Sequence, residues 1–225
     1  MQTKVADLSA REFFNQIADP DVFCGGGSVA ALAAAGAAAT ALLVMRLNVK
    51  RRSNAGKRAE IQQAIGETEA AIDAFHAAAD DDIAILGELL TAQRAARSGG
   101  SSDDYLAALT NAAESPLRMA ERIAILLDTI ATQLPISTRF TVSDLGAAAV
   151  LAEGACRAAL LTAEVNIALL GDADGVDAGM VRNLEDRRAG VRTRVVERSV
   201  MIEGVARALM LGTPPPAAEL GKGQA

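Results

Sequence analysis

Three adjacent aspartates, Asp80, Asp81 and Asp82, interrupt an apolar run in the segment AAADDDIAIL and are the first candidates for acid–base chemistry. Consecutive side chains on a helix point in different directions, so we expect at least one of these carboxylates to face the packed side. A partly desolvated carboxyl has a raised pKa and suits general acid–base work. The same pattern is also typical of an exposed acidic edge, and both interpretations stay open.

The chain has one histidine, His76, which restricts the other kinds of catalytic site. A Ser-His-Asp triad would need this residue, and no nucleophile motif lies near it in the sequence. Asp73, His76 and Asp80 share one helix face, but the sequence has no Glu-x-x-His pairs of the kind that build di-iron bundle sites. We therefore predict no metal site. Cys24 and Cys156 lie far apart in the sequence and predict no disulfide framework.

A glycine turn, made of Gly25, Gly26, Gly27 and Ser28, precedes an Ala-rich run. The first amides of a helix are unpaired and can hold an anion. A Walker A loop would need Gly-Lys-Ser/Thr where this chain continues with Val-Ala, and a dinucleotide fingerprint would need a preceding strand. An anion site and a turn that lets two helices approach are equally compatible with the motif.

A basic cluster follows the Ala-rich run and consists of Lys50, Arg51, Arg52, Lys57 and Arg58. It is the densest positive cluster in a chain of net charge −6. The pattern is compatible with a solvated turn. It is equally compatible with a site for a polyanionic tail, since the arginine fork binds carboxylates through two hydrogen bonds.

The elements that must position these residues are predicted to be helices. Just over half of the 225 residues are apolar, mostly Ala, Leu, Val and Ile, and only six are aromatic. The fold class is therefore all-α, a bundle of about six helices with Ala/Gly-rich central helices. The expected helices are a short one capped by Ser9 with Glu12, then Ser28–Leu47 with Ser28 as its N-cap, Gly56–Arg97, Asp104–Leu134, one capped by Ser143, and Val176–Leu211. Pro116 is expected to kink the fourth helix or to restart it with Ser115 as its cap.

One domain is expected over residues 1–212, with a disordered tail at 213–225. The net charge of −6 and the scarcity of aromatics disfavour nucleic-acid binding. The apolar run Val29–Met45 is at the lower length limit for a membrane span, and more than half of it is Ala or Gly, so we reject that interpretation. The N-terminus does not resemble a signal peptide, which favours a cytoplasmic protein.

The segment GGGSVAALAAAGAAA resembles the signature of the cyclodeaminase/cyclohydrolase family. This family includes the cyclodeaminase domain of formiminotransferase-cyclodeaminase and stand-alone bacterial methenyltetrahydrofolate cyclohydrolases. The glycine turn, the basic turn at Arg51-Arg52, the stretch Asp81–Ile85 and the helix start Val142-Ser143-Asp144 match family motifs in the same order, and ESPLRMAERI resembles the family's Pro-Leu helix. The resemblance covers roughly residues 9 to 205. In this chain Cys24 replaces the usual proline, Lys50 stands where glycine is common, and Ile85 replaces an aromatic.

The resemblance implies an all-α homodimer with its site near the subunit contact. The implied substrate is a one-carbon tetrahydrofolate with an anionic glutamate tail, and no tightly bound cofactor is implied. The expected reaction is hydrolysis of 5,10-methenyltetrahydrofolate to 10-formyltetrahydrofolate. The alternatives are a formiminotetrahydrofolate cyclodeaminase that releases ammonia and a non-catalytic folate-binding or scaffold dimer.

The resemblance also assigns roles to particular residues. Asp81 is expected to be the general base, and Asp144 to hold the pterin edge or stabilise the cationic carbon. Backbone amides of Gly25, Gly26, Gly27 and Ser28 are expected to contact the substrate. The remaining substrate-binding residues are Arg51 and Arg52, which would receive the glutamate tail, and Ser143.

Overall fold

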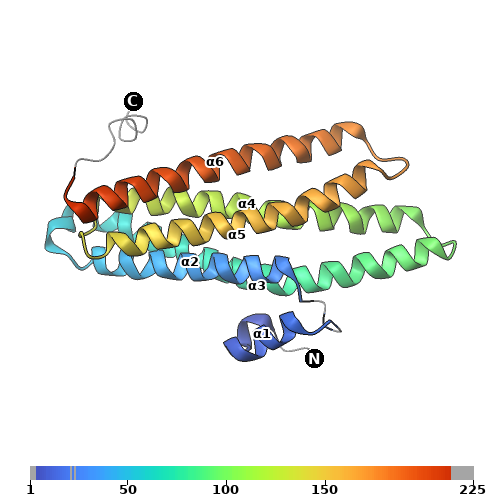
Figure 1. Ribbon diagram of the computed structural model, residues 1–225, viewed down its shortest axis with the longest axis horizontal. Coiled ribbons are helices and arrows are strands. Elements are labelled where there is room, and N and C mark those ends of the chain that lie inside the picture. The colour runs from blue at the N-terminus through green and yellow to red at the C-terminus, as the bar shows by residue number, and fades with distance from the viewer. Residues whose placement is uncertain (1–3, 21, 23, 214–225) are drawn as a thin grey trace.

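The computed structural model describes residues 4–20, 22 and 24–213, and its regular elements are all helical within those residues (Figure 1). The α helices are α1 (Ala10–Ala18), α2 (Gly26–Asn48), α3 (Arg58–Arg97), α4 (Ser102–Gln133), α5 (Val142–Gly171) and α6 (Ala178–Leu211). Short 3-10 helices are η1 (Val5–Asp7), η2 (Arg52–Lys57) and η3 (Leu134–Ile136). The prediction of an all-α fold with about six helices is confirmed.

Four long helices, α3 to α6, run side by side along the long axis, and the shorter α2 covers part of their length (Figure 1). α2 packs mainly against α3 and α5, whereas α4 packs against α3, α5 and α6. At about 1.5 Å per residue, the 40 residues of α3 extend far beyond the 23 residues of α2. The bundle therefore extends beyond the N-terminal end of α2, where only the longer helices continue.

The small side chains of α2 and α5 explain how closely these two helices pack. The fully or almost fully buried alanines are Ala30, Ala31, Ala34, Ala35, Ala37, Ala38 and Ala41 of α2 and Ala148, Ala149, Ala152, Ala155, Ala159 and Ala163 of α5. Alanine favours the helix and lets neighbouring backbones approach each other. The two Ala-rich helices thus form the centre of the bundle. Both are long and apolar enough to cross a membrane by length and composition, but the core accounts for much of that apolar surface.

Two predicted helix caps are wrong. The N-cap of α2 is Gly25, and Ser28 lies in the first turn because its hydroxyl is used for a contact with α3. The N-cap of α5 is Thr141, and Ser143 lies inside the helix, where its hydroxyl donates to the carbonyl oxygen of Phe140 at 3.3 Å. In both cases a serine in the first turn has a tertiary or local partner that the sequence pattern does not reveal.

Helix α4 continues through Pro116, so of the two alternatives expected there the restart with Ser115 as a cap is wrong, and the expected kink stays a prediction. Proline has no N–H, which leaves the carbonyl four residues earlier without its helical donor. That carbonyl belongs to Ala112, and the side-chain amide of Asn166 on α5 donates to it at 2.8 Å. A neighbouring helix therefore supplies the hydrogen bond that the proline removes.

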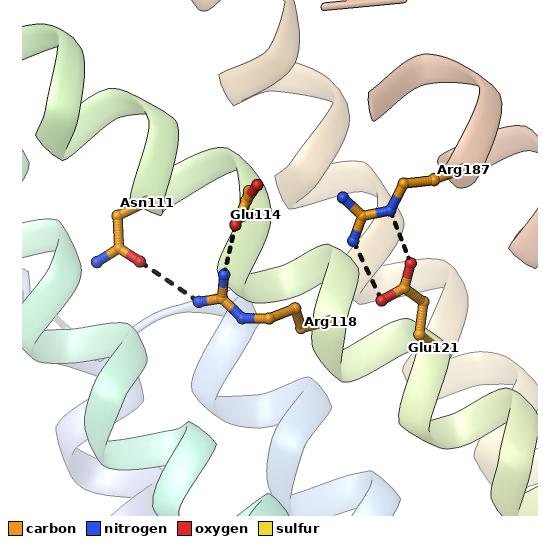
Figure 2. Close-up of polar contacts among 5 residues, drawn as sticks. All are labelled: Asn111, Glu114, Arg118, Glu121 and Arg187. Carbon is orange, nitrogen blue, oxygen red and sulfur yellow. Dashed lines mark hydrogen bonds and ion pairs between the residues drawn. The ribbon is translucent and has the colours of Figure 1, made fainter. Parts of the chain in front are cut away.

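Side chains on the surface of α4 brace the helix around this point (Figure 2). The Arg118 guanidinium contacts the carboxylate of Glu114 at 2.7 Å and the amide oxygen of Asn111 at 3.4 Å. One turn further along, Arg187 of α6 donates two hydrogen bonds to Glu121, at 2.9 and 3.2 Å (Figure 2). The paired geometry fixes α6 against α4 at the level of these residues.

The remaining boundaries agree with the sequence within a few residues. Ser9 and Glu12 form the predicted capping box of α1. The third helix begins at Arg58, after the turn η2, instead of at Gly56. Apart from Thr213, the predicted tail at 213–225 lies outside the described residues.

Candidate active site

The carboxylate of Asp82 on α3 faces the first turn of α2. Its Oδ2 accepts a hydrogen bond from the backbone N–H of Ser28 at 2.9 Å. The Ser28 hydroxyl lies 3.0 Å from that same oxygen and 3.0 Å from the carbonyl oxygen of Ala79, so one proton serves two acceptors. Ser28 is fully buried, which shields this contact from water.

Gly27 is required by the close approach of Asp82. A Cβ atom at this position would lie 2.0 Å from Oδ1 of Asp82. No side chain fits there unless the carboxylate moves away from α2. Gly25 and Gly26 have open space where a Cβ would lie, so the steric requirement falls on the third glycine alone.

Burial raises the pKa of the Asp82 carboxyl, and the two hydrogen bonds from Ser28 partly offset that rise. The group is therefore easier to protonate than an exposed aspartate, while the ionised form retains two donors. The start of α2 adds the positive end of a helix dipole, which favours the ionised form. A carboxyl balanced in this way can take up a proton and return it.

Cys24 lies beside this group and is almost completely buried. Burial raises the pKa of its thiol, a hydrogen bond with Ser28 offsets part of that rise, and the nearby charge of Asp82 adds to it. The thiol is therefore kept protonated, as expected of a small apolar filler.

A cavity of about 150 Å³ lies beyond the start of α2, in the part of the bundle that α2 does not reach. Its lining comes from Gly25, Gly26 and Gly27 of the glycine turn, from Asp82, Ile85, Leu86 and Leu89 of α3, from Ala112, Ser115 and Pro116 of α4, and from Thr162 and Asn166 of α5. Most of this surface is apolar, and Asp82 is the titratable side chain within it. The cavity combines a partly open, mostly apolar space with one carboxyl and the first amides of a helix.

The three adjacent aspartates point to three different surroundings. Asp80 accepts a hydrogen bond from the backbone N–H of Val5 at 2.7 Å, and Asp82 contacts α2. Asp81 is exposed and does not line the cavity. The expectation that at least one carboxylate faces the packed side is confirmed. The residue chosen from the resemblance, Asp81, lies outside the cavity.

The other predicted site residues lie at the opposite end of α2. Arg51 and Arg52 follow its last residue, and Ser143 and Asp144 open α5 at that same end of the bundle (Figure 1). Arg51 donates to the carbonyl oxygen of Ile136 at 2.7 Å, which ties the basic turn to η3. The 23 residues of α2 span roughly 33 Å. One chain therefore does not bring its two groups of predicted site residues together.

Sequence reasoning missed three polar residues of the cavity: Ser115, Thr162 and Asn166. They lie on α4 and α5, far in sequence from Asp82, and none belongs to a motif for catalysis. Only Asn166 could have been noticed in the sequence, because it is a polar residue in the apolar stretch AEVNIALL.

Comparisons with known proteins identify relatives of the whole bundle. The family model described as Formiminotransferase-cyclodeaminase matches residues 9–182. A solved structure of formiminotetrahydrofolate cyclodeaminase from Thermotoga maritima has a similar fold, with a TM-score of 0.76 and 20% sequence identity. The similarity covers 92% of this chain and 98% of that one. No curated protein sequence matches significantly.

The solved structure, at its low identity, shows that the fold is shared. The family model covers well over half of this chain, including the glycine turn, Asp82 and every other residue of the cavity. The chain belongs to the formiminotransferase-cyclodeaminase family.

Proposed function

We propose that this protein is a methenyltetrahydrofolate cyclohydrolase, which hydrolyses 5,10-methenyltetrahydrofolate to 10-formyltetrahydrofolate. The observation that carries the proposal is the Asp82 carboxyl, which is held by Ser28 at the edge of an apolar cavity. Family membership supports a folate with a one-carbon group as the substrate. Among the three neighbouring aspartates, Asp82 replaces Asp81 as the proposed base, because Asp81 is exposed and lies outside the cavity.

The reaction needs one group that accepts a proton and later returns it. Water attacks the cationic carbon between N5 and N10, and one of its protons passes to the Asp82 carboxylate. The tetrahedral carbon then expels N5: the bond between carbon and N5 breaks, Asp82 protonates N5, and the remaining hydroxyl proton goes to solvent. A negative carboxylate near the cationic carbon also stabilises the positive charge before attack.

A second candidate is the cyclodeaminase reaction on 5-formiminotetrahydrofolate. The names of the family and of the Thermotoga maritima protein favour it. In that reaction N10 attacks the formimino carbon while the formimino nitrogen is protonated as =NH2+. Asp82 removes the proton from N10, and the same carboxyl passes it to the resulting –NH2 group, which leaves as ammonia when its bond to carbon breaks. Both reactions use the same proton carrier, so the choice between them depends on the substrate that the cavity accepts.

The surface of α2 and α5 supports a homodimer. Both helices expose a stripe of large apolar side chains: Val29, Leu43 and Leu47 on α2, and Val150, Leu151, Leu161, Val165 and Leu169 on α5. The cavity is lined by the glycine turn at the start of α2, and the basic turn and Asp144 are at the end of α2 and the start of α5. Figure 1 shows that the start of α2 and the start of α5 lie at opposite ends of this pair of helices. A two-fold axis through the middle of the face would bring the cavity of one copy to the basic turn of the other.

In such a dimer each site is shared between the two subunits. Asp82 would supply the proton chemistry from one copy. Arg51 and Arg52 of the partner subunit would receive the glutamate tail, and Asp144 of the partner subunit would contact the substrate from the same side. This arrangement gives a role to every residue group that the resemblance selects, although the two groups are far apart in one chain.

The first test compares Asp82→Asn with Asp81→Asn in the full-length purified protein. The decay of 5,10-methenyltetrahydrofolate absorbance is followed at mildly acidic pH, where spontaneous hydrolysis is slow. Loss of a general acid–base group costs about 100-fold or more in turnover, so Asp82→Asn should fall by that factor. Asp81→Asn should stay within about threefold of the wild type, because an exposed carboxylate outside the cavity takes no part in the proton transfer.

Near wild-type turnover by Asp82→Asn would show that Asp82 is not the proton carrier. If the wild type does not accelerate the decay at all, ammonia release from 5-formiminotetrahydrofolate tests the second candidate. The absence of both activities would reject a catalytic role and favour the scaffold.

A further inference from the structure

The side chain of Asn166 has a fixed orientation, and Pro116 is the cause. Pro116 lacks an N–H, so the carbonyl of Ala112 is free to accept the hydrogen bond from the Asn166 amide nitrogen at 2.8 Å. A carbonyl oxygen only accepts hydrogen bonds, so the nitrogen of the amide must be the atom that faces Ala112. The opposite orientation of the amide, with its oxygen toward Ala112, would place two acceptors against each other.

The amide oxygen of Asn166 is consequently not used in the contact with Ala112. Asn166 is half-buried and lines the cavity together with Pro116 and Asp82. Within the described part of the chain, no donor contacts this oxygen, and the one buried side-chain polar atom without a partner is Oδ1 of Asn48. The oxygen of Asn166 is therefore not occupied by a protein donor, and a ligand donor in the cavity that this residue lines can pair with it.

Asn166 and Asp82 lie on helices at opposite sides of the cavity. α3 supplies Asp82 and α5 supplies Asn166, and α4 lies between the two helices and packs against both. A flat ring that presents its reacting edge to Asp82 would present its other end to α5. In a reduced pterin the reacting nitrogen N5 and the exocyclic amino group at C2 lie at opposite ends of the bicyclic ring.

We propose that Asn166 is a specificity-determining residue, whose side-chain oxygen accepts a hydrogen bond from the exocyclic amino group of the pterin. This inference rests on the proposed folate substrate and adds the group by which the ring is recognised. A site that pairs its polar groups with the correct ligand rejects an analogue without the donor, because the acceptor then stays unpaired. Pro116 is a positioning residue in this scheme, since it directs the amide nitrogen of Asn166 away from the ligand.

The positioning role gives the proposal a sharp test. Pro116→Ala restores an N–H that can pair with the Ala112 carbonyl inside α4. The Asn166 amide then loses its fixed partner and can turn its nitrogen toward the cavity. The two residues should therefore be coupled: Pro116→Ala weakens recognition of the amino group only when Asn166 is present.

The experiment measures binding of two probes by isothermal titration calorimetry to the full-length protein. One probe is 5-formyltetrahydrofolate, which is chemically stable, and the other is its analogue with a methyl group in place of the amino group at C2. The wild type should bind the amino compound at least about tenfold more tightly. Asn166→Leu should reduce this preference to less than about twofold, and Asn111→Leu, on the neighbouring helix but outside the cavity, should retain it.

Pro116→Ala should lower the preference by about threefold or more, and the double variant Pro116→Ala/Asn166→Leu should show no further loss beyond Asn166→Leu. Circular dichroism and the midpoint of thermal unfolding check that each variant is folded. If Asn166→Leu does not fold, the preference for the amino compound is compared between the wild type and Pro116→Ala, and a lower preference in Pro116→Ala supports the role of Asn166.

A preference that survives in Asn166→Leu, or in a folded Pro116→Ala, would overturn the role of Asn166 while leaving the folate proposal intact. The same holds if the wild type binds both probes equally. A wild type that binds neither probe would instead reject the folate substrate, and the assignment of Asn166 would fail with it.

Discussion

At the scale of single residues, Gly27 and Asp82 determine each other's position. The carboxylate reaches the first turn of α2 only because residue 27 has no side chain. Gly27→Ala should displace Asp82 from Ser28, lower turnover at least about tenfold, and destabilise the fold on the order of 1–3 kcal/mol through overpacking.

Turnover and urea denaturation measure these two effects. Gly66→Ala is the matched control, because its Cβ meets open space on an exposed face of α3 and alanine is the better helix former. That control should keep its activity and gain stability by roughly 0.5–1 kcal/mol. If Gly27→Ala behaves like Gly66→Ala, the tight contact between Gly27 and Asp82 does not exist.

The raised pKa of Asp82 has a consequence for stability, and its sign follows from proton linkage. The carboxyl binds a proton more tightly in the folded state than in the unfolded state, where its pKa is near the ordinary value of 3.8. Its contribution to stability is therefore complete below pH 3.8 and is lost as the pH rises through the higher folded pKa. Asp82→Asn removes this loss, because an amide does not titrate.

The free energy of unfolding of Asp82→Asn, relative to the wild type, should accordingly increase as the pH rises from below 4 toward neutrality. Urea denaturation at a series of pH values measures the difference. A pH-independent difference, or one that decreases, would show that the folded state does not disfavour the charged carboxylate. In activity assays, the rise in turnover that accompanies ionisation of the Asp82 carboxyl should occur at a higher pH than for an ordinary aspartate.

The sequence narrowed the acid–base group to three adjacent aspartates but did not identify which one faces the cavity. The rotation of α3 decides this, and a shift of one residue turns a side chain by about 100°. Asn166 was missed because its role depends on a missing hydrogen bond of another helix, at Ala112. Such a dependence between residues 54 positions apart leaves no trace in local spacing.

At the scale of elements, the N-terminal segment is attached to the bundle at few points. α1 stands away from the long helices (Figure 1), and the buried Phe13 is its main apolar anchor. The charged hydrogen bond from Val5 to Asp80 adds a second attachment at η1. Asp80→Ala should therefore loosen residues 4–18 and leave the rest of the bundle almost unchanged.

Hydrogen exchange followed by mass spectrometry tests this directly. Faster exchange confined to the N-terminal peptides is expected in Asp80→Ala, with the midpoint of thermal unfolding lowered by no more than a few degrees. Asp81→Ala, at the neighbouring exposed position, is the control and should exchange like the wild type. Unchanged exchange in Asp80→Ala would mean that the buried side chains of Val5 and Phe13 fix the segment without this hydrogen bond.

The elements themselves were largely predictable, because helix propensity and apolar periodicity agree along most of the chain. The errors occurred where a tertiary partner replaced a local rule. Ser28 matched the pattern of a cap but bonds to α3. Pro116 matched the pattern of a break, but Asn166 satisfies the carbonyl that it leaves unpaired.

At the scale of the whole molecule, the separation of the two groups of site residues is the feature that one chain does not explain. Asp82 and the basic turn lie at opposite ends of α2, roughly 33 Å apart. α2 and α5 pack against each other, and both expose large apolar side chains. Sequence reasoning placed both groups in a single folate site but had no means of measuring the distance between them, which depends on the length and straightness of α2.

Subunit complementation tests the shared site. Asp82→Asn removes the proton carrier, and Arg52→Glu should repel the glutamate tail without disturbing the core, because Arg52 is exposed. Each variant alone should be nearly inactive at low substrate concentration.

If each site combines Asp82 of one copy with Arg52 of the other, a mixed dimer contains one site with both substitutions and one intact site. Unfolding and refolding the two variants together in equal amounts should therefore recover about a quarter of wild-type activity, since half of the dimers are mixed and each has one intact site. Absence of recovery, with mixed dimers demonstrated by native mass spectrometry, would mean that each chain carries its site alone and that Arg52 acts at some other place.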